Sequence, residues 1–91
     1  MYKGSLNESL KDPIEAAAYL NAALEENSTE AFLLALRNVA EARGISQLAE
    51  QTTLNRENMY RMLSKRGNPQ LSSLKILLNG LGLRLAVGIK S

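Results

Sequence analysis

Apolar residues recur at helical spacing through most of the chain, and the first such segment follows a clear helix start. Asp12 stands in an N-cap position, Pro13 at the first helical position and Glu15 two residues further on, a combination typical of helix N-termini. We therefore predict a helix over residues 13–27. Its inward face is predicted to hold Ile14, Ala17, Ala18 and Leu24, with Leu20 beside them.

A second apolar stripe predicts a helix that begins at Ser28 or Thr29 and ends near Arg43, before Gly44. Gly is favoured just after the last helical residue because it adopts the backbone conformation of a helix stop at little cost. The inward positions of this helix are Phe32, Leu33, Leu36, Val39 and Ala40.

Two shorter helices follow, over Ser46–Thr52 and Asn55–Ser64, with Ser46 and Asn55 as their N-caps and a bend at Thr53–Leu54 between them. Helix-turn-helix units, in which two helices meet at a steep angle, have apolar positions at this spacing. The predicted inward positions are Leu48, Ala49, Leu54, Met59 and Met62, with Leu63 adjacent.

The C-terminal third predicts a turn at Gly67–Pro69, a fifth helix and a strand. Gly80 and Gly82 mark the end of that helix, whose inward residues are Leu71, Leu74, Leu77 and Leu78. In the tail, Leu83, Leu85, Val87 and Ile89 alternate with less apolar residues. A lone strand leaves backbone groups unpaired, so we expect it to pair with the same strand of a second copy.

The exposed side of the second short helix offers the chemistry of DNA recognition. With Met59 and Met62 inward, the outward residues are Arg56, Glu57, Asn58, Tyr60 and Arg61. Arg pairs with guanine and Asn with adenine in the major groove, and Glu accepts from cytosine or restrains a neighbouring Arg. Tyr60 suits phosphate contact, thymine packing or partial burial equally.

Other polar residues next to this helix are predicted to contact DNA phosphates. Lys65, Arg66 and Asn68 follow the helix, and Gln47 stands at the start of the helix before it. Taken one by one, such side chains on a helix are usually just solvated, so the prediction rests on their occurrence together with the apolar framework.

Charge divides the chain into two halves. Residues 1–53 carry four Lys or Arg and eight Asp or Glu, whereas residues 54–91 carry seven and one, within an overall net charge of +2. The basic half is where a polyanion would bind, and the acidic half suggests a different partner.

Composition narrows the remaining function classes. The 91 residues predict one domain, residues 1–11 a flexible arm, and a core built from Leu, Ala and Ile because there are only one Phe and three Tyr. The chain has no Cys and no His, which removes disulfides, the usual zinc ligands and the commonest general base. We expect no enzyme, no metal site and no cofactor. No apolar run has the length of a membrane span or signal peptide, and we expect a cytoplasmic protein.

At the level of motifs, the chain resembles the Xre/Cro-like antidote (antitoxin) proteins of bacterial type II toxin–antitoxin modules, the HigA-like group. The resemblance spans about residues 12–89 and is carried by "AAAYLNAALEE", "FLLALRNVAEARGISQLAEQT" and "NRENMYRMLSKRGNPQLSSLKILLNGLGLRLAV". It implies an all-α, five-helix lambda-repressor-like domain with a C-terminal strand that pairs across a dimer. It also implies a homodimeric repressor of its own operon, which binds a palindromic operator in double-stranded DNA and neutralises a RelE/HigB-like ribonuclease toxin.

Residue by residue, the resemblance points to a DNA-facing set of Gln47, Asn55, Arg56, Glu57, Asn58, Tyr60 and Arg61. The chain departs from the family pattern at Thr53, where Gly is usual. Gly suits a positive φ and a β-branched residue does not, so the turn here either avoids positive φ or is strained.

Two other functions fit the same sequence. One is a stand-alone phage-type regulator without a toxin, and the other is a protein-interaction module that kept the fold but not DNA binding.

Overall fold

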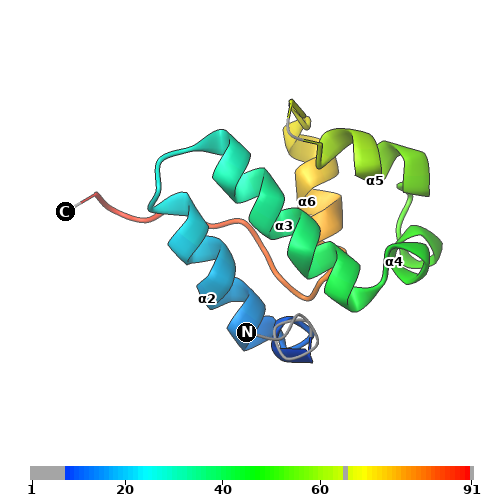
Figure 1. Cartoon of the computed structure of the whole chain (residues 1–91), viewed down its shortest axis with the longest axis horizontal. Helices are drawn as coiled ribbons and strands as arrows, with labels where there is room; N and C mark the ends of the chain where they lie inside the picture. Colours follow the sequence, from blue (N-terminus) through cyan, green and yellow to red (C-terminus); the bar gives the residue numbers. More distant parts are fainter. Residues whose placement is uncertain (1–7, 65, 91) are drawn as a thin grey trace.

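The computed structural model describes residues 8–64 and 66–90 (Figure 1). Within these residues the helices with defined bounds are α2 (Pro13–Leu24), α3 (Thr29–Arg43), α4 (Ile45–Gln51), α5 (Arg56–Met62) and α6 (Leu71–Gly80). Residues 8–10 are helical too. The all-α prediction is therefore confirmed and each of the five predicted helices is present, but the five-helix count is too low because of this further helical segment.

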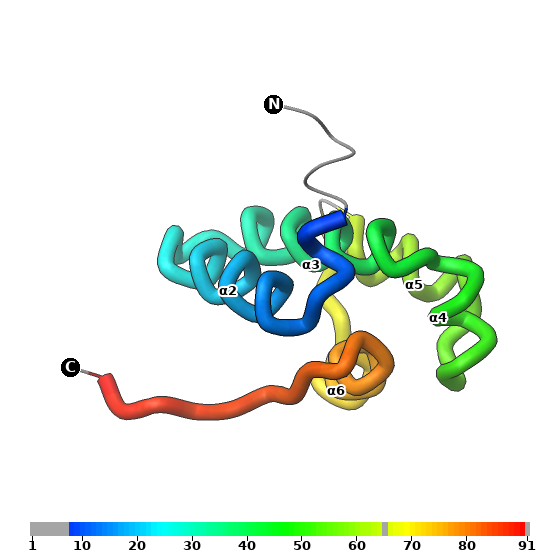
Figure 2. The backbone as a smooth tube through the Cα atoms, turned by 90° about the horizontal axis from the view of Figure 1, so that it is seen from below, coloured from blue at the N-terminus to red at the C-terminus, as the bar shows by residue number. Residues whose placement is uncertain are grey.

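The strand expected over residues 83–89 does not form within this single chain, because the described residues contain no strand. The tail runs from the end of α6 back along the molecule toward the end occupied by α2 (Figure 2). Its backbone from residue 84 to 90 makes no hydrogen bond to another described residue. Pairing with a second copy stays a prediction.

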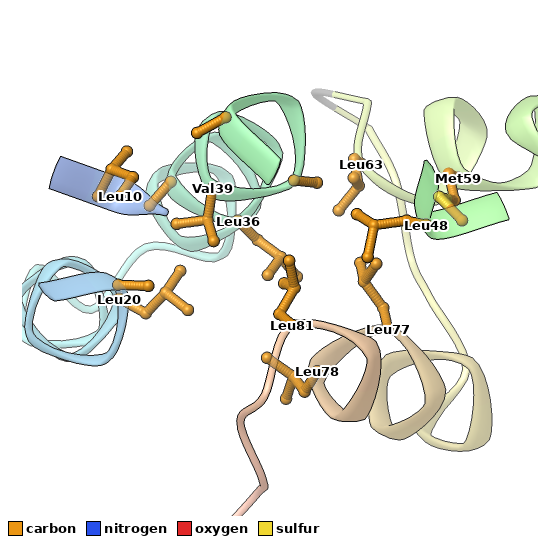
Figure 3. Packing of buried hydrophobic residues seen from close by; sticks show 14 of the residues in the cluster. Leu10, Leu20, Leu36, Val39, Leu48, Met59, Leu63, Leu77, Leu78 and Leu81 are labelled. Atoms are coloured by element: carbon orange, nitrogen blue, oxygen red, sulfur yellow. The ribbon is translucent and has the colours of Figure 1, made fainter. Parts of the chain in front are cut away.

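The helices surround one core. Helices α2 and α3 pack together at one end of the molecule, and α4 and α5 lie at the other end (Figure 1). Seen from below, α6 lies beneath the layer that these helices form (Figure 2). The fully buried side chains come from α3, α4, α5 and α6 and their flanks and meet in the middle (Figure 3): Leu36, Val39, Leu48, Met59, Leu63, Leu77 and Leu81.

Residues 8–11 do not form part of a flexible arm. Leu10 has an exposed fraction of 3% and belongs to the core (Figure 3), and backbone bonds from Lys11 to Glu8 and from Asp12 to Ser9 close a turn around it. The expectation of a flexible arm is therefore wrong for residues 8–11, because Leu10 buries its side chain. Residues 1–7 lie outside the described residues.

Two predicted N-caps, Asp12 and Asn55, are confirmed by hydrogen bonds, and Ser28 is a third cap. The side chain of Asp12 accepts from the Ile14 N–H at 3.1 Å, that of Ser28 from the Ala31 N–H at 3.2 Å, and that of Asn55 from the Asn58 N–H at 2.7 Å. Such a bond satisfies one of the free N–H groups of the first turn.

The third predicted cap, Ser46, is wrong. Helix α4 begins one residue earlier, at Ile45, and its N-cap is Gly44 with φ of +110°. Gly44 also receives the last turn of α3, since its N–H donates to the Ala40 carbonyl. Gly44, at positive φ, therefore ends α3 and begins α4. A residue with a side chain would be strained in this backbone conformation.

The predicted inward face of α2 is also wrong. Ala16, Leu20 and Ala23 are buried, while Ile14 and Leu24 are 77% and 56% exposed. Small residues at positions 16 and 23 suit close approach to α3, and the Asn38 side chain of α3 donates to the Tyr19 hydroxyl at 2.9 Å. The helix ends at Leu24 rather than residue 27.

Helix α6 reaches the core with its second half. Leu77 and Leu78 are buried and Leu74 packs against the core, as predicted, but Leu71 in the first turn is 64% exposed. Gly82 has φ of +80°, its N–H donates to the Asn79 carbonyl, and the Leu83 N–H donates to the Leu78 carbonyl at 2.8 Å. This is a Schellman stop, for which Gly at C′ is the usual residue.

Arg43 was predicted only as a last-turn residue of the second helix. Its guanidinium donates to the carbonyls of Gly80 at 3.4 Å and Leu81 at 3.1 Å. These acceptors belong to the end of α6, where carbonyls lack helical partners. A side chain of α3 thus ties down the end of α6.

Candidate nucleic-acid interface

The α4–α5 unit, residues 45–62, stands on the apolar framework that the sequence predicted. Leu48 and Met59 are fully buried, and Met62 and Leu54 are 7% and 8% exposed. Ala49 is half-buried and packs against the core. In Figure 1 α4 is seen nearly end-on while α5 lies across the view, so the two helices cross steeply. Their spacing and crossing fit a helix-turn-helix unit.

The turn between α4 and α5 avoids positive φ. Asn27, far from this turn, is the one described non-glycine residue with positive φ, so Thr53 adopts an ordinary conformation. The neighbouring Thr52 hydroxyl donates to the Leu48 carbonyl at 2.7 Å and accepts from the Leu54 N–H at 3.2 Å. The sequence reasoning considered Thr53 and missed Thr52, although a Thr that follows a short helix is a common hydrogen-bonding turn residue.

The outward side of α5 carries the predicted polar set. Arg56, Glu57, Asn58 and Arg61 are all exposed, since Met59 and Met62 occupy the inward side. Within the described residues, the ion pairs are Lys11–Glu8 and Arg37–Glu41. Neither includes an α5 residue, so Glu57 does not restrain Arg56 or Arg61 by an ion pair.

Tyr60 is partly packed. Its exposed fraction is 40%, and the Arg37 guanidinium carbon lies 5.9 Å from the ring centroid, within the range of a cation–π contact. Arg37 also contacts Glu41 at 3.3 Å. The ring face is therefore used within the molecule. The sequence reasoning did not foresee Arg37, because the contact joins α3 to α5 across the fold.

A hollow beside α5 is lined by two of the predicted phosphate-side residues, Arg66 and Asn68. It lies between the end of α5, the loop after it and the start of α6. Gly67 in this loop has no room for a side chain, since a Cβ would lie 2.3 Å from the Met62 carbonyl oxygen. Lys65 lies outside the described residues. The polar residues that line the hollow include Asn58, Arg61, Arg66 and Asn68, together with Gln70 and Ser73, which the sequence reasoning did not name.

A second hollow lies between α4 and α5. Asn55, Arg56 and Glu57 line it, together with Thr53 and Glu50. Gln47 is exposed in the first turn of α4 and lines neither hollow. The side-chain oxygen of Asn55 is occupied by its cap bond, so its amide N–H₂ is the group left for a ligand. The negative charge of Glu57, in the first turn of α5, also interacts favourably with the positive end of the helix dipole.

The residues assigned to a dimer contact divide into two kinds. Leu83 packs against the core of its own chain. Leu85 is 42% exposed, and Val87 and Ile89 are fully exposed. Leu85 lies in an apolar groove that α2 residues Ala17, Leu20 and Leu24 also line.

Comparison with known proteins gives the chain a family. A family described as "Probable addiction module antidote protein" matches residues 2–89. The chain belongs to this family. An uncharacterized protein of Haemophilus influenzae (strain ATCC 51907 / DSM 11121 / KW20 / Rd) is 36% identical over 80 residues, which cover 88% of this antidote-family chain and 82% of the relative. No solved structure matches.

Family membership implies a toxin as partner of this antidote protein and suggests a role other than catalysis. Among the described residues, no cluster of three or more His, Cys, Asp or Glu is arranged to hold a metal ion. No helix in the same part of the antidote is both long and apolar enough to cross a membrane.

Proposed function

We propose that this antidote is a sequence-specific DNA-binding repressor of its own operon. The observation that carries the proposal is the division of α5 into a buried side, Met59 and Met62, and an exposed side with Arg56, Asn58 and Arg61. An exposed helix on a rigid base is the element that enters the major groove in helix-turn-helix proteins of the lambda-repressor-like type.

The exposed residues receive distinct roles in this proposal. Arg56 and Arg61 pair with guanine and Asn58 with adenine. Glu57 accepts from cytosine, and the Tyr60 hydroxyl contacts a phosphate because its ring face is held by Arg37. Phosphate contacts come from Gln47, the amide of Asn55, Lys65, Arg66 and Asn68.

Fluorescence anisotropy on DNA from upstream of the gene tests this proposal. We expect tight, salt-sensitive binding to one palindromic fragment and weaker binding to a scrambled fragment of the same composition. Equal affinity for both fragments at every salt concentration would contradict sequence-specific repression and favour an interaction module.

Homodimer formation through the tail is part of the same proposal. A two-fold axis would place two α5 helices about one DNA turn apart. The tail presents the exposed apolar side chains of Leu85, Val87 and Ile89 for packing against the same tail of a second chain. Leu83 is excluded from the test variant because its N–H closes the end of α6. Deletion of residues 84–91 should therefore give a folded monomer in analytical ultracentrifugation, and a truncated chain that stays dimeric would rule out the tail.

We also propose a RelE/HigB-like ribonuclease as the toxin and the outer side of α2 as its docking surface. A nuclease that binds RNA needs basic groups, and α2 carries exposed, acidic Glu15 next to exposed Ile14. Support also comes from position, because α2 lies at the end of the molecule away from α5 (Figure 1).

Co-expression with the neighbouring gene, followed by pull-down, tests the toxin proposal. Ile14→Arg should abolish capture of the neighbouring gene product because it adds a positive charge where a basic partner docks. Leu71→Arg is the matched control, since Leu71 is comparably exposed on α6. Capture lost in both variants or in neither would contradict the assignment of α2, and a wild-type chain that captures nothing would favour a stand-alone regulator.

A further inference from the structure

Thr52 forms the joint between the two helices of the α4–α5 unit. It follows α4 directly, with φ of −125° and ψ of +175°. Its hydroxyl lies nearer the Leu48 carbonyl, at 2.7 Å, than the Leu54 carbonyl, at 3.4 Å, so its single proton serves the free acceptor at the end of α4. The same oxygen is the acceptor for the Leu54 N–H, which has no backbone partner among the described residues. One side chain thus satisfies the last turn of α4 and the bend that leads into α5.

The methyl group of Thr52 has a separate contact. It faces Gly80 near the end of α6, where a Cβ would lie 2.9 Å from the Thr52 Cγ2 and 3.4 Å from the Leu48 Cδ2. Helix α4 therefore approaches α6 this closely because residue 80 has no side chain. Gly80 does not have a positive φ, so close approach rather than backbone conformation requires glycine here.

We infer that Thr52 is a positioning residue for DNA recognition: its hydroxyl sets the path from α4 into α5, and its methyl seats α4 on α6 at Gly80. The inference rests on the proposed DNA-binding function. It explains how the turn keeps an ordinary φ at Thr53, because the hydrogen bonds of Thr52 hold the bend that a glycine would otherwise permit. Leu54, which is buried directly after the bend, fixes the start of α5 to the core.

The inference separates specific from non-specific binding. Contacts with phosphates depend on the number of cationic groups and tolerate small changes in helix direction. Contacts with base edges require side chains aimed within a fraction of an ångström. A shift of α5 should therefore weaken binding to the operator and leave binding to scrambled DNA unchanged. Simple loss of folded protein would lower both affinities by the same factor.

The test is fluorescence anisotropy of the full chain on the operator fragment and on a scrambled fragment. Thr52→Val keeps the shape and removes the hydroxyl, and should lower the ratio of specific to non-specific affinity by about tenfold, the equivalent of one or two lost hydrogen bonds. Thr52→Ser keeps the hydroxyl but loses the methyl that faces Gly80, and should lower the ratio less than Thr52→Val does. Thr29→Val is the matched control, because Thr29 is exposed at the start of α3 and lines neither hollow of the candidate interface.

A second pair of variants keeps the inference testable if Thr52→Val does not fold. Gly80→Ala should lower the same ratio by roughly fivefold through its contact with the Thr52 methyl. Thr52→Ser combined with Gly80→Ala removes that methyl and should restore the ratio found with Thr52→Ser alone.

The outcomes distinguish the two levels of the proposal. A wild-type ratio in Thr52→Val, or a double variant no better than Gly80→Ala, would overturn the positioning role while DNA binding stands. A wild-type chain with no preference for any upstream fragment would overturn the proposed function, and the positioning role with it.

Discussion

The α4–α5 unit and the outer side of α2 are both exposed helical surfaces, yet they differ in what lies beneath and what is displayed. The α4–α5 unit has fully buried Leu48 and Met59 under it and displays Arg, Asn and Gln. The outer side of α2 displays Ile14, which is 77% exposed, beside acidic Glu15. Polar groups in water are stable without a partner, whereas contiguous exposed apolar patches mark contacts with other molecules. In the proposed function, the first surface meets DNA and the second meets the toxin.

The largest expected effect is a loss of stability when a core residue beneath the α4–α5 unit is replaced. Leu48→Ala should lower the free energy of unfolding by about 2–5 kcal/mol, since it removes a fully buried side chain and leaves a cavity. Leu71→Ala, at an exposed position, should stay within about 0.5 kcal/mol of wild type. Urea denaturation followed by circular dichroism measures both. Similar losses in the two variants would show that the core is not centred on the α4–α5 unit.

The loop beside α5 should be nearly as sensitive. Gly67→Ala should cost about 1–3 kcal/mol, because the added methyl would meet the Met62 carbonyl and the backbone must move. Gly88→Ala is the control, as its Cβ would have no atom within 4 Å. Thermal unfolding of the two variants tests this, and a wild-type transition in Gly67→Ala would contradict the close packing of the loop.

The displayed arginines should affect binding without affecting stability. Arg56→Ala or Arg61→Ala should weaken operator binding by about 1–3 kcal/mol if each makes a bidentate base contact. Arg84→Ala removes the same charge from the tail and should have a smaller effect. Binding of the cognate fragment is measured by anisotropy at constant salt. An Arg56 variant with full affinity would remove that residue from the reading set.

The smallest expected effect distinguishes the N-cap role of Asn55 from its proposed contact with DNA. Asn55→Ala should lower stability by about 1 kcal/mol because α5 loses its N-cap, whereas Asn55→Ser keeps a capping oxygen. If Asn55 also contacts DNA through its amide, Asn55→Ser should be as stable as wild type and bind the operator less tightly. Reduced stability in both variants would show that Ser does not replace the cap.

The sequence predicted the parts of the structure that depend on near neighbours in the chain. The caps at Asp12 and Asn55 follow from a side chain and an N–H two or three residues away. The framework of Leu48, Leu54, Met59 and Met62 follows from periodicity. Ser46 shows the limit of this reasoning, because Gly44 closes α3 and opens α4 at once.

What the sequence by itself determined was an all-helical chain, the outward residues of α5 and the basic character of their surroundings, since each follows from local spacing and composition. The tertiary structure alone decided which of two apolar sides of α2 is buried, because small residues at Ala16 and Ala23 suit α3 and hydrophobicity does not distinguish the sides. It also decided the contacts of Arg43 with the end of α6 and of Arg37 with Tyr60. The role of Thr52 depends on both the sequence and the tertiary structure. Its hydroxyl bonds are local in the chain, whereas its methyl group meets Gly80 only after the chain has folded.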